Sequence, residues 1–299
     1  MQPQVNILNG RDLACSVRQK LAAGVAQHMH QGYRAPQLCT VLVGNDPASA
    51  IYVRNKQKQA AAIGITPKPI YLEQHTSEKQ LLHCIDQLNA NDAIDAILVQ
   101  LPLPPQINVH AVLRHVDPHK DVDGFHPSNV GLLSMGIPRF IPCTPRACMQ
   151  LLQHAKVQLT GRHAVVLGRS LIVGKPLAQL LLAQHATVTI CHSRTVDLPN
   201  ITRQADVLVC AMGKAQYITA AHVQPNATVI DVGINRHNGG KLVGDVDTQS
   251  VLPLVHAITP VPGGVGPMTI AMLLDNTYRA YCARMGFDNN LPAQEIAHV

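Results

Sequence analysis

The sequence predicts an α/β protein of two domains with parallel sheets. Short apolar runs rich in β-branched residues alternate with stretches of helical periodicity, which is typical of βαβ units. The chain has 299 residues, and roughly 150 residues per domain suggests two domains. The alternation breaks at residues 117–145, where five prolines and three glycines leave few regular backbone hydrogen bonds. We therefore place a domain boundary there.

The strands and helices follow from the two periodicities. The expected strands are residues 38–43, 68–72, 96–101, 163–167, 186–191, 205–210, 228–232 and 257–259. The expected helices are residues 12–30, 48–63, 78–89, 145–154, 175–184 and 268–284. We expect the last helix, which follows a Pro- and Gly-rich segment at 260–267, to return to the first domain, and the tail 288–299 to be mobile. The expected domains are thus residues 1–142 with 267–299, and residues 143–266.

The composition excludes several classes of protein. Hydrophobic residues make up 46% and charged residues 14%, which suits a globular core and not a disordered chain. No apolar run approaches the ~18 residues of a membrane span, and the N-terminus lacks the features of a secretion signal. We expect a cytoplasmic protein with no membrane partner.

Metal sites, disulfides and nucleic acid are also disfavoured. The eight cysteines include no CxxC pair, so we expect them reduced and mostly buried, and the 16 histidines form no His-Glu-x-x-His motif. The 24 lysines and arginines form no run, and aromatic residues are only 3% of the chain. A nucleic-acid surface needs clustered cations and stacking rings. The net charge of +6 better fits a small polyanionic or phosphate-bearing ligand.

A candidate cofactor site follows the expected strand 163–167. Gly168 begins a turn that lets the backbone approach a ligand, and a helix begins near Gly174, where free N–H groups favour a pyrophosphate. The spacing matches neither Gly-x-Gly-x-x-Gly nor a phosphate-binding P-loop, so an ordinary strand–turn–helix connection is an equal alternative.

The next strand indicates which nucleotide would bind. An NAD site usually has an acid about 20 residues on, but the strand 186–191 ends in His-Ser-Arg-Thr at 192–195. Ser193 and the guanidinium of Arg169 or Arg194 favour a 2′-phosphate, so we expect NADP over NAD. The alternative for both arginines is a solvated loop charge.

Candidate catalytic residues lie in the first half of the chain. Tyr52 and Lys56 are four apart and share a helix face, where they could stack on a ring and deliver a proton, or form only a basic surface stripe. Short-chain dehydrogenases use this spacing too, but after the cofactor-binding half. Gln100 ends an apolar strand, at the sheet edge that binds ligands in α/β proteins. Asp121 and Asp123 precede a Gly turn, where they form an Asx-turn or pair with a heterocycle.

Five motifs, in this order along the chain, resemble one family. They are Tyr-Val-Arg-Asn-Lys at 52–56, Val-Gln-Leu-Pro-Leu-Pro at 99–104, Lys-Asp-Val-Asp-Gly-Phe at 120–125, Gly-Arg-Ser-Leu-Ile-Val-Gly-Lys-Pro at 168–176, and Thr-Pro-Val-Pro-Gly-Gly-Val-Gly-Pro-Met-Thr at 259–269. Together they resemble the FolD-type bifunctional methylenetetrahydrofolate dehydrogenase/methenyltetrahydrofolate cyclohydrolase family. The similarity runs from about Gly10 to Tyr281.

The resemblance implies an architecture and a chemistry. It implies two α/β domains flanking a cleft, a folate-binding catalytic domain at 1–142 with 267–299, a Rossmann-like NADP-binding domain at 143–266, and a homodimer. The implied reaction oxidises 5,10-methylenetetrahydrofolate with NADP⁺ to the methenyl cation and hydrolyses the cation to 10-formyltetrahydrofolate. A cyclohydrolase that has lost hydride transfer, a shikimate-type dehydrogenase and a non-catalytic folate-binding protein are the alternatives.

The resemblance also implies residue roles. Lys56 matches the catalytic lysine, Gln100 the amide that positions it, Tyr52 the ring that packs on folate, and Asp123 the acid that holds the pterin's amino edge. The remaining substrate-side residues are Ser49, Val99, Leu101, Asp121, Pro262, Gly263, Gly264 and Thr269. The cofactor-side residues are Gly168, Arg169, Ser170, Ile172, Ser193, Arg194, Gly233 and Ile234. No metal ligand is implied.

Overall fold

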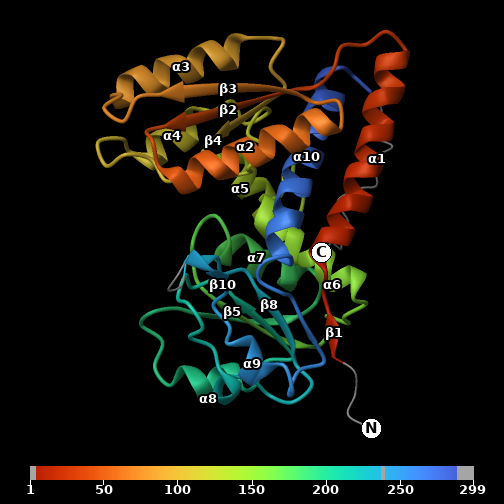
Figure 1. Ribbon diagram of the computed structural model, residues 1–299, viewed down its shortest axis with the longest axis vertical. Helices are drawn as coiled ribbons and strands as arrows, with labels where there is room; N and C mark the ends of the chain where they lie inside the picture. Colours follow the sequence, from red (N-terminus) through yellow and green to blue (C-terminus); the bar gives the residue numbers. More distant parts are fainter. Residues whose placement is uncertain (1–4, 237–239, 288–299) are drawn as a thin grey trace. The chain divides into compact units, whose positions relative to one another are not determined.

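The computed structural model describes residues 5–236 and 240–287, apart from the side chain of Ala48, and it divides into two compact units (Figure 1). Of the described residues, 16–141 and 273–287 form one unit, which we call the three-stranded unit. Residues 5–15 and 142–272 form the other, which we call the six-stranded unit. The divisions fall inside α1 (Gly10–His30) and α10 (Val265–Arg284).

The three-stranded unit contains a parallel sheet with strand order β3-β2-β4. Its strands are β2 (Gln37–Val43), β3 (Thr66–Leu72) and β4 (Ala96–Val99). Six of the seven residues of the central strand β2 are buried, because helices cover a parallel sheet on both faces. The helices are α2 (Pro47–Ala62), α3 (Glu78–Ala90), α4 (Val109–His115) and α5 (Pro127–Ser134), together with most of α1 and the later part of α10.

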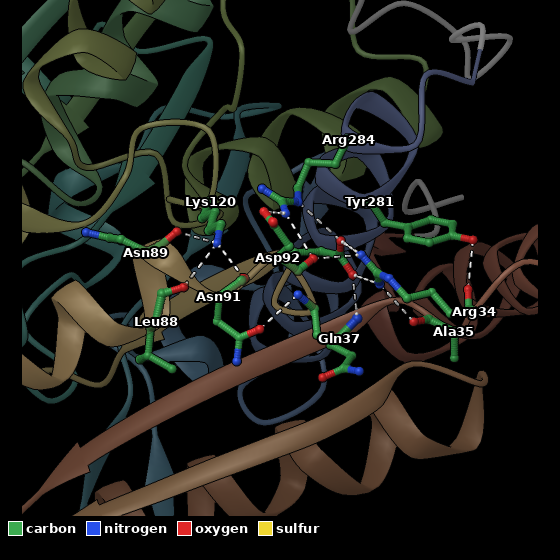
Figure 2. Close-up of polar contacts among 12 residues, drawn as sticks. Arg34, Ala35, Gln37, Leu88, Asn89, Asn91, Asp92, Lys120, Tyr281 and Arg284 are labelled. Atoms are coloured by element: carbon green, nitrogen blue, oxygen red, sulfur yellow. Dashed lines mark hydrogen bonds and ion pairs between the residues drawn. The ribbon is translucent and has the colours of Figure 1, made fainter.

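Buried charges fix the start of this sheet. Asp95, directly before β4, has no exposed surface, and its two carboxylate oxygens each accept a hydrogen bond of 2.7 Å from Arg34. The Gln37 backbone N–H donates to the same carboxylate at 2.8 Å. The Arg284 guanidinium lies 3.5 Å from the Asp95 carboxylate, and Figure 2 shows Lys120 turned toward the carbonyls at the end of α3. The Asp95 carboxylate thus joins the first residue of β2 to the residue before β4 and fixes the starts of the two strands relative to each other.

The six-stranded unit contains a parallel sheet with strand order β1-β11-β8-β7-β5-β6. Its strands are β1 (Asn6–Ile7), β5 (His163–Leu167), β6 (Thr187–Cys191), β7 (Val207–Cys210), β8 (Thr228–Asp231) and β11 (Ala257–Ile258). The helices are α6 (Cys143–His154), α7 (Gly174–Ala183), α8 (Leu198–Thr202), α9 (Thr248–Val251) and the 3₁₀ turn η1 (Ala220–His222). A small antiparallel pair joins β9 (Asn235–Arg236) to β10 (Leu242–Val243).

The α/β class with mainly parallel strands is confirmed, and each expected strand and helix is present. The largest displacement of an end is at the last helix, expected from residue 268 and observed from Val265. The segment 117–145 was expected to be irregular, and this was wrong for α5. Pro127 occupies the first helical position, where a missing N–H is tolerated, and the His126 ring nitrogen accepts the Ser128 N–H at 3.0 Å.

The ends of the chain differ from the expected division. Residues 5–15 belong with the six-stranded unit, because β1 pairs in parallel with β11, although we expected residues 1–142 in the first domain. The last helix joins the three-stranded unit from Leu273, six residues after the expected start of that segment at 267. The tail 288–299, expected to be mobile, lies outside the described residues.

The cysteines are free, and most of them are buried. All eight cysteines are free thiols, and six are buried, with Cys15 exposed and Cys84 in an intermediate position. Burial raises the pKa of the Cys39 and Cys148 thiols to about 12, which keeps them protonated and unreactive. Among the described residues, every helix is too short or too polar to cross a bilayer.

Candidate active site

Helix α2 and the end of strand β4 bring Lys56 and Gln100 together. The Lys56 ammonium donates to the Gln100 side-chain oxygen at 3.0 Å. The Gln100 side-chain nitrogen donates to the Leu101 carbonyl at 2.7 Å, so the amide oxygen is the atom that faces the lysine. The Gln100 backbone N–H donates to the Val41 carbonyl at 2.8 Å and so ties this residue to the sheet. A neutral amide orients the ammonium without giving it a counter-charge.

The start of α2 is determined by its capping residues. The Asp46 carboxylate accepts the Ser49 backbone N–H at 2.8 Å, and Pro47 occupies the first turn. Ser49 is buried in this turn, while Tyr52, one turn before Lys56, is 39% exposed. A half-exposed ring beside a half-buried lysine on one helix face can contact a planar ligand.

The turn at residues 121–124 runs beside β4. The Ile97 N–H donates to the Lys120 carbonyl at 2.8 Å, and Ile97 and Asp121 form a parallel bridge. The bridge ends at Asp121, where the chain turns and the Gly124 N–H donates to the Asp121 carbonyl at 3.1 Å. Asp123 in this turn is half-buried, while Val99 at the end of β4 is buried and Leu101 is partly exposed. The bridge therefore places the start of this turn beside β4 in the three-stranded sheet.

Asp121 has a structural environment. It is 5% exposed, and one carboxylate oxygen accepts the His126 N–H at 2.7 Å and the Asn129 side-chain amide at 2.9 Å. Burial raises the pKa of Asp121, and these hydrogen bonds oppose that shift. The carboxylate holds the turn into α5.

In the six-stranded unit, Gly168 and Gly174 allow a close approach of α7 to the turn after β5. Gly168 has φ +126°, and a Cβ there would lie 2.4 Å from the Ala211 carbonyl oxygen. A Cβ at Gly174 would lie 2.1 Å from the Gly168 oxygen. Ser170 contributes its hydroxyl oxygen, which accepts the Val173 N–H at 3.1 Å. Side chains larger than hydrogen would separate the helix from the turn.

The turns after β5 and β6 begin side by side. Leu167 pairs with Cys191, and the Gly168 N–H donates to the Cys191 carbonyl at 2.8 Å. Local bonds fix the second turn: the Thr195 hydroxyl accepts the His192 N–H at 2.8 Å. The predicted cofactor-side residues on these two turns, Arg169, Ser170, Ile172, Ser193 and Arg194, are all exposed, as is Leu171.

Two buried aspartates bind the loops after β7 and β8. Asp231, 2% exposed, accepts the N–H groups of Gly233 at 2.9 Å and of Asp245 and Val246 at 3.0 Å each. The carboxylate of Asp245 in turn accepts three successive N–H groups of the loop after β7, those of Met212, Gly213 and Lys214. This network holds Gly233 buried and leaves Ile234 47% exposed. Sequence reasoning missed it, because no spacing motif links the two aspartates.

The segment before α10 packs against the first residue of α1. A Cβ at Gly10 would lie 1.9 Å from the Gly264 oxygen. Gly263 has φ +117° and is buried with Gly264, whereas Pro262 is exposed. The Thr269 hydroxyl lies 3.2 Å from that of Thr144. All of these residues belong to the six-stranded unit.

Comparisons with known proteins decide the family. The catalytic-domain model of tetrahydrofolate dehydrogenase/cyclohydrolase matches residues 8–123, and the NAD(P)-binding-domain model of the same family matches residues 142–285. This chain belongs to the tetrahydrofolate dehydrogenase/cyclohydrolase family. The resemblance inferred from the five motifs is thereby confirmed.

Individual family members resemble the chain over most of its length. The bifunctional protein FolD of Sorangium cellulosum is 54% identical over 280 residues, which cover 93% of this chain and 98% of the relative. The FolD crystal structure from Campylobacter jejuni has a TM-score of 0.92 and 42% identity, covering 94% of this chain and all of that one. The Trypanosoma brucei FolD structure, complexed with NADP and an inhibitor, has a TM-score of 0.91 and 38% identity. The match covers 95% of this chain and 99% of that one.

The placement of the candidate residues follows the two units. The three-stranded unit contains Ser49, Tyr52, Lys56, Val99, Gln100, Leu101, Asp121 and Asp123, and the six-stranded unit contains the other substrate-side residues and all of the cofactor-side residues. Within the described part of the chain, no three His, Cys, Asp or Glu side chains are grouped as a metal site.

We predict that stability depends on the ionisation of Asp231. Burial raises its pKa from 3.8 to about 6, so the folded state retains a proton that the unfolded state has lost between those values. The stabilising contribution is therefore complete below about pH 4 and is lost as the pH rises through about 6. In urea unfolding, the stability advantage of the parent over Asp231→Asn should fall by about 2 kcal/mol from pH 4 to 7. A difference that does not change with pH would contradict the prediction.

Proposed function

We propose that this chain is a bifunctional enzyme of one-carbon folate metabolism. It oxidises 5,10-methylenetetrahydrofolate to 5,10-methenyltetrahydrofolate with NADP⁺, and it hydrolyses the methenyl product to 10-formyltetrahydrofolate. The observation that carries the proposal is the Lys56–Gln100 hydrogen bond of 3.0 Å, formed at the end of a parallel strand in a chain of this family. It places an oriented proton donor at the sheet edge where α/β proteins bind ligands.

The two steps make different demands on the protein. In the first, the methylene carbon loses a hydride to NADP⁺, and the two folate nitrogens stabilise the cation, so positioning matters more than a strong base. In the second, water adds to the methenyl carbon, a proton leaves and one carbon–nitrogen bond breaks. Lys56 transfers protons in this hydrolysis, and Gln100 holds its ammonium in place.

The folate-binding roles follow from position and chemistry. Tyr52 packs its exposed ring on the folate, and Asp123 accepts hydrogen bonds from the amino edge of the pterin. Asp121 supports the turn from its buried position. The remaining residues proposed to contact the substrate are Ser49, Val99 and Leu101 in the three-stranded unit and, in the six-stranded unit, Pro262, Gly263, Gly264 and Thr269.

The six-stranded unit has the features of an NADP site. Gly168 and Gly174 keep the backbone close to a helix N-terminus, which suits a pyrophosphate. Arg169, Ser193 and Arg194 provide two exposed cations and a hydroxyl for the 2′-phosphate, and residues 192–195 contain no carboxylate to repel it. Ser170, Ile172, Gly233 and Ile234 complete the proposed contacts. When bound, NADP⁺ supplies the hydride acceptor.

A direct assay tests the function. Purified protein is mixed with 5,10-methylenetetrahydrofolate and NADP⁺ or NAD⁺, while reduced nicotinamide, methenyl product and 10-formyl product are quantified separately. We expect NADPH together with the 10-formyl product. Hydrolysis of methenyl substrate without NADPH would leave only a cyclohydrolase, and no turnover would overturn the proposal.

We predict that Lys56→Ala lowers cyclohydrolase activity by ~10²–10⁴-fold, the usual contribution of a general acid or base. Dehydrogenase activity should fall less, because hydride transfer does not need this proton. Lys58→Ala, an exposed lysine on the same helix, is the matched control and should retain both activities. Equal losses of the two activities in Lys56→Ala would contradict the assignment.

We predict that Arg169→Ala raises KM for NADP⁺ by roughly 10- to 100-fold, because it removes a charge-assisted hydrogen bond to the 2′-phosphate. KM for NAD⁺, which lacks that phosphate, should change much less. Arg162→Ala is the control, because Arg162 lies before the start of β5 and Arg169 follows its end. If the preference for NADP⁺ over NAD⁺ is unchanged, Arg169 does not bind the 2′-phosphate.

We also propose a cytoplasmic homodimer. Strand β6 is an edge strand, and it exposes Ile190 at 40%, while the neighbouring helix α7 exposes Leu182 at 64%. Such an edge favours pairing with another chain. Free thiols at all eight cysteines suit a reducing compartment. We predict a molar mass of twice that of the chain by light scattering, and a shift toward the monomer in Ile190→Lys; a monomeric parent protein would contradict the prediction.

A further inference from the structure

The turn that carries Asp123 is held by a buried side chain that the proposed mechanism does not use. Asn276, on α10, has no exposed surface. Its side-chain amide nitrogen donates to the Val122 carbonyl at 2.8 Å and to the Ile141 carbonyl at 3.0 Å. These acceptors are 154 and 135 residues away along the chain, and all three residues lie in the three-stranded unit. The amide therefore joins the turn to α10.

The bond to Val122 acts directly on the backbone of Asp123. The Val122 carbonyl and the Asp123 N–H belong to one planar peptide group. When the Val122 oxygen is held, the orientation of this peptide plane is fixed. The Asp123 Cα lies in the same plane, so the directions open to the Asp123 carboxylate are restricted. Because Val122 is itself fully buried, an unpaired carbonyl there would be costly, and alternative orientations of the peptide are disfavoured.

The residues on the other side of Val122 are fixed independently. Lys120 is fully buried, and its ammonium donates to the carbonyls of Leu88 at 3.0 Å, Asn89 at 2.7 Å and Asn91 at 2.9 Å (Figure 2). These are carbonyls at the C-terminal end of α3, where a cation is favourable. Asp121 is bound to the entry of α5 by the hydrogen bonds described above. The backbone is thus anchored at 120, 121 and 122 just before it reaches the half-buried Asp123.

We propose that Asn276 is a positioning residue for folate recognition, which acts by orienting the Val122–Asp123 peptide so that the Asp123 carboxylate faces the amino edge of the pterin. The inference rests on the proposed function, because it requires that Asp123 bind the substrate. It assigns to α10 a role in substrate affinity through one side chain that does not contact the substrate.

The first test compares steady-state constants of Asn276→Leu with those of the parent enzyme. Leucine has a similar size and removes both donors. We expect KM for 5,10-methylenetetrahydrofolate to rise about tenfold, the effect of one lost hydrogen bond, with kcat nearly unchanged and KM for NADP⁺ unaltered. A purely structural role would instead lower thermal stability and the active fraction and leave both KM values as they were, and that result would overturn the proposal.

A matched control lies next to Asn276 on the same helix. Thr277 is also fully buried, and its hydroxyl donates to the Leu273 carbonyl within α10 at 2.9 Å, away from the turn. Thr277→Val should leave KM for the folate unchanged. If Asn276→Leu fails to fold, Asn276→Ser keeps a single shorter donor, and it should raise the same KM to a smaller extent. A parental KM in a folded Asn276→Ser protein would count against the proposal.

A double-mutant cycle separates this inference from the proposed function. If Asn276 acts through Asp123, then Asn276→Leu should have no further effect on KM for the folate in an Asp123→Ala background. If the two substitutions raise KM for the folate by independent factors that multiply in the double variant, Asn276 does not act through Asp123, and only the inference is overturned. If Asp123→Ala by itself leaves this KM unchanged, the assigned role of Asp123 fails and the inference fails with it.

Discussion

In each of the two main sheets every strand runs in the same direction, so all strand carboxyl ends come to one edge. The loops that leave those edges carry candidate residues of both units: Gln100 follows β4, Gly168 follows β5, Ser193 follows β6 and Gly233 follows β8, while Tyr52 and Lys56 lie on helix α2. Parallel pairing therefore concentrates polar loop residues at the places where α/β proteins bind ligands. The rest of the molecule supports this arrangement, with helices on the sheet faces and polar anchors beneath the loops.

Those anchors share one physical feature. Asp95, Lys120, Asp231 and Asp245 are charged groups with almost no exposed surface, and each satisfies its hydrogen-bonding capacity mainly or partly with backbone groups. A buried charge is tolerated only when it is paired or fully hydrogen-bonded. Each one consequently holds the backbone segments around it in a single arrangement, because moving a segment would leave the charge without partners. Asp231 and Asp245 fix the loops after β7 and β8, Lys120 fixes the segment before Asp123, and Asp95 fixes the beginnings of β2 and β4.

Local features were predictable from the sequence, and long-range polar contacts were not. Periodicity located the longer strands and helices but missed short elements such as β1, α4 and α5. The spacing of Tyr52 and Lys56 on one helix face needed only the pitch of an α-helix. The contact between Lys56 and Gln100 came from family resemblance, because no periodicity connects residues on different elements. Asn276 left no signal at all: an asparagine inside a helical pattern looks like a surface residue until the folded chain brings Val122 against it.

The pairing of β1 with β11 determines which fragments of this protein can be cut out or exchanged between genes as complete units. The edge of the six-stranded sheet is closed by residues from the start of the chain, about 250 positions before their partner strand. A fragment cut out as residues 142–272 would lack this strand and would expose the edge of β11. The nucleotide-side half is therefore not a cassette that one recombination event can transfer intact between genes. Exchange of this half requires the chain's opening segment to travel with it.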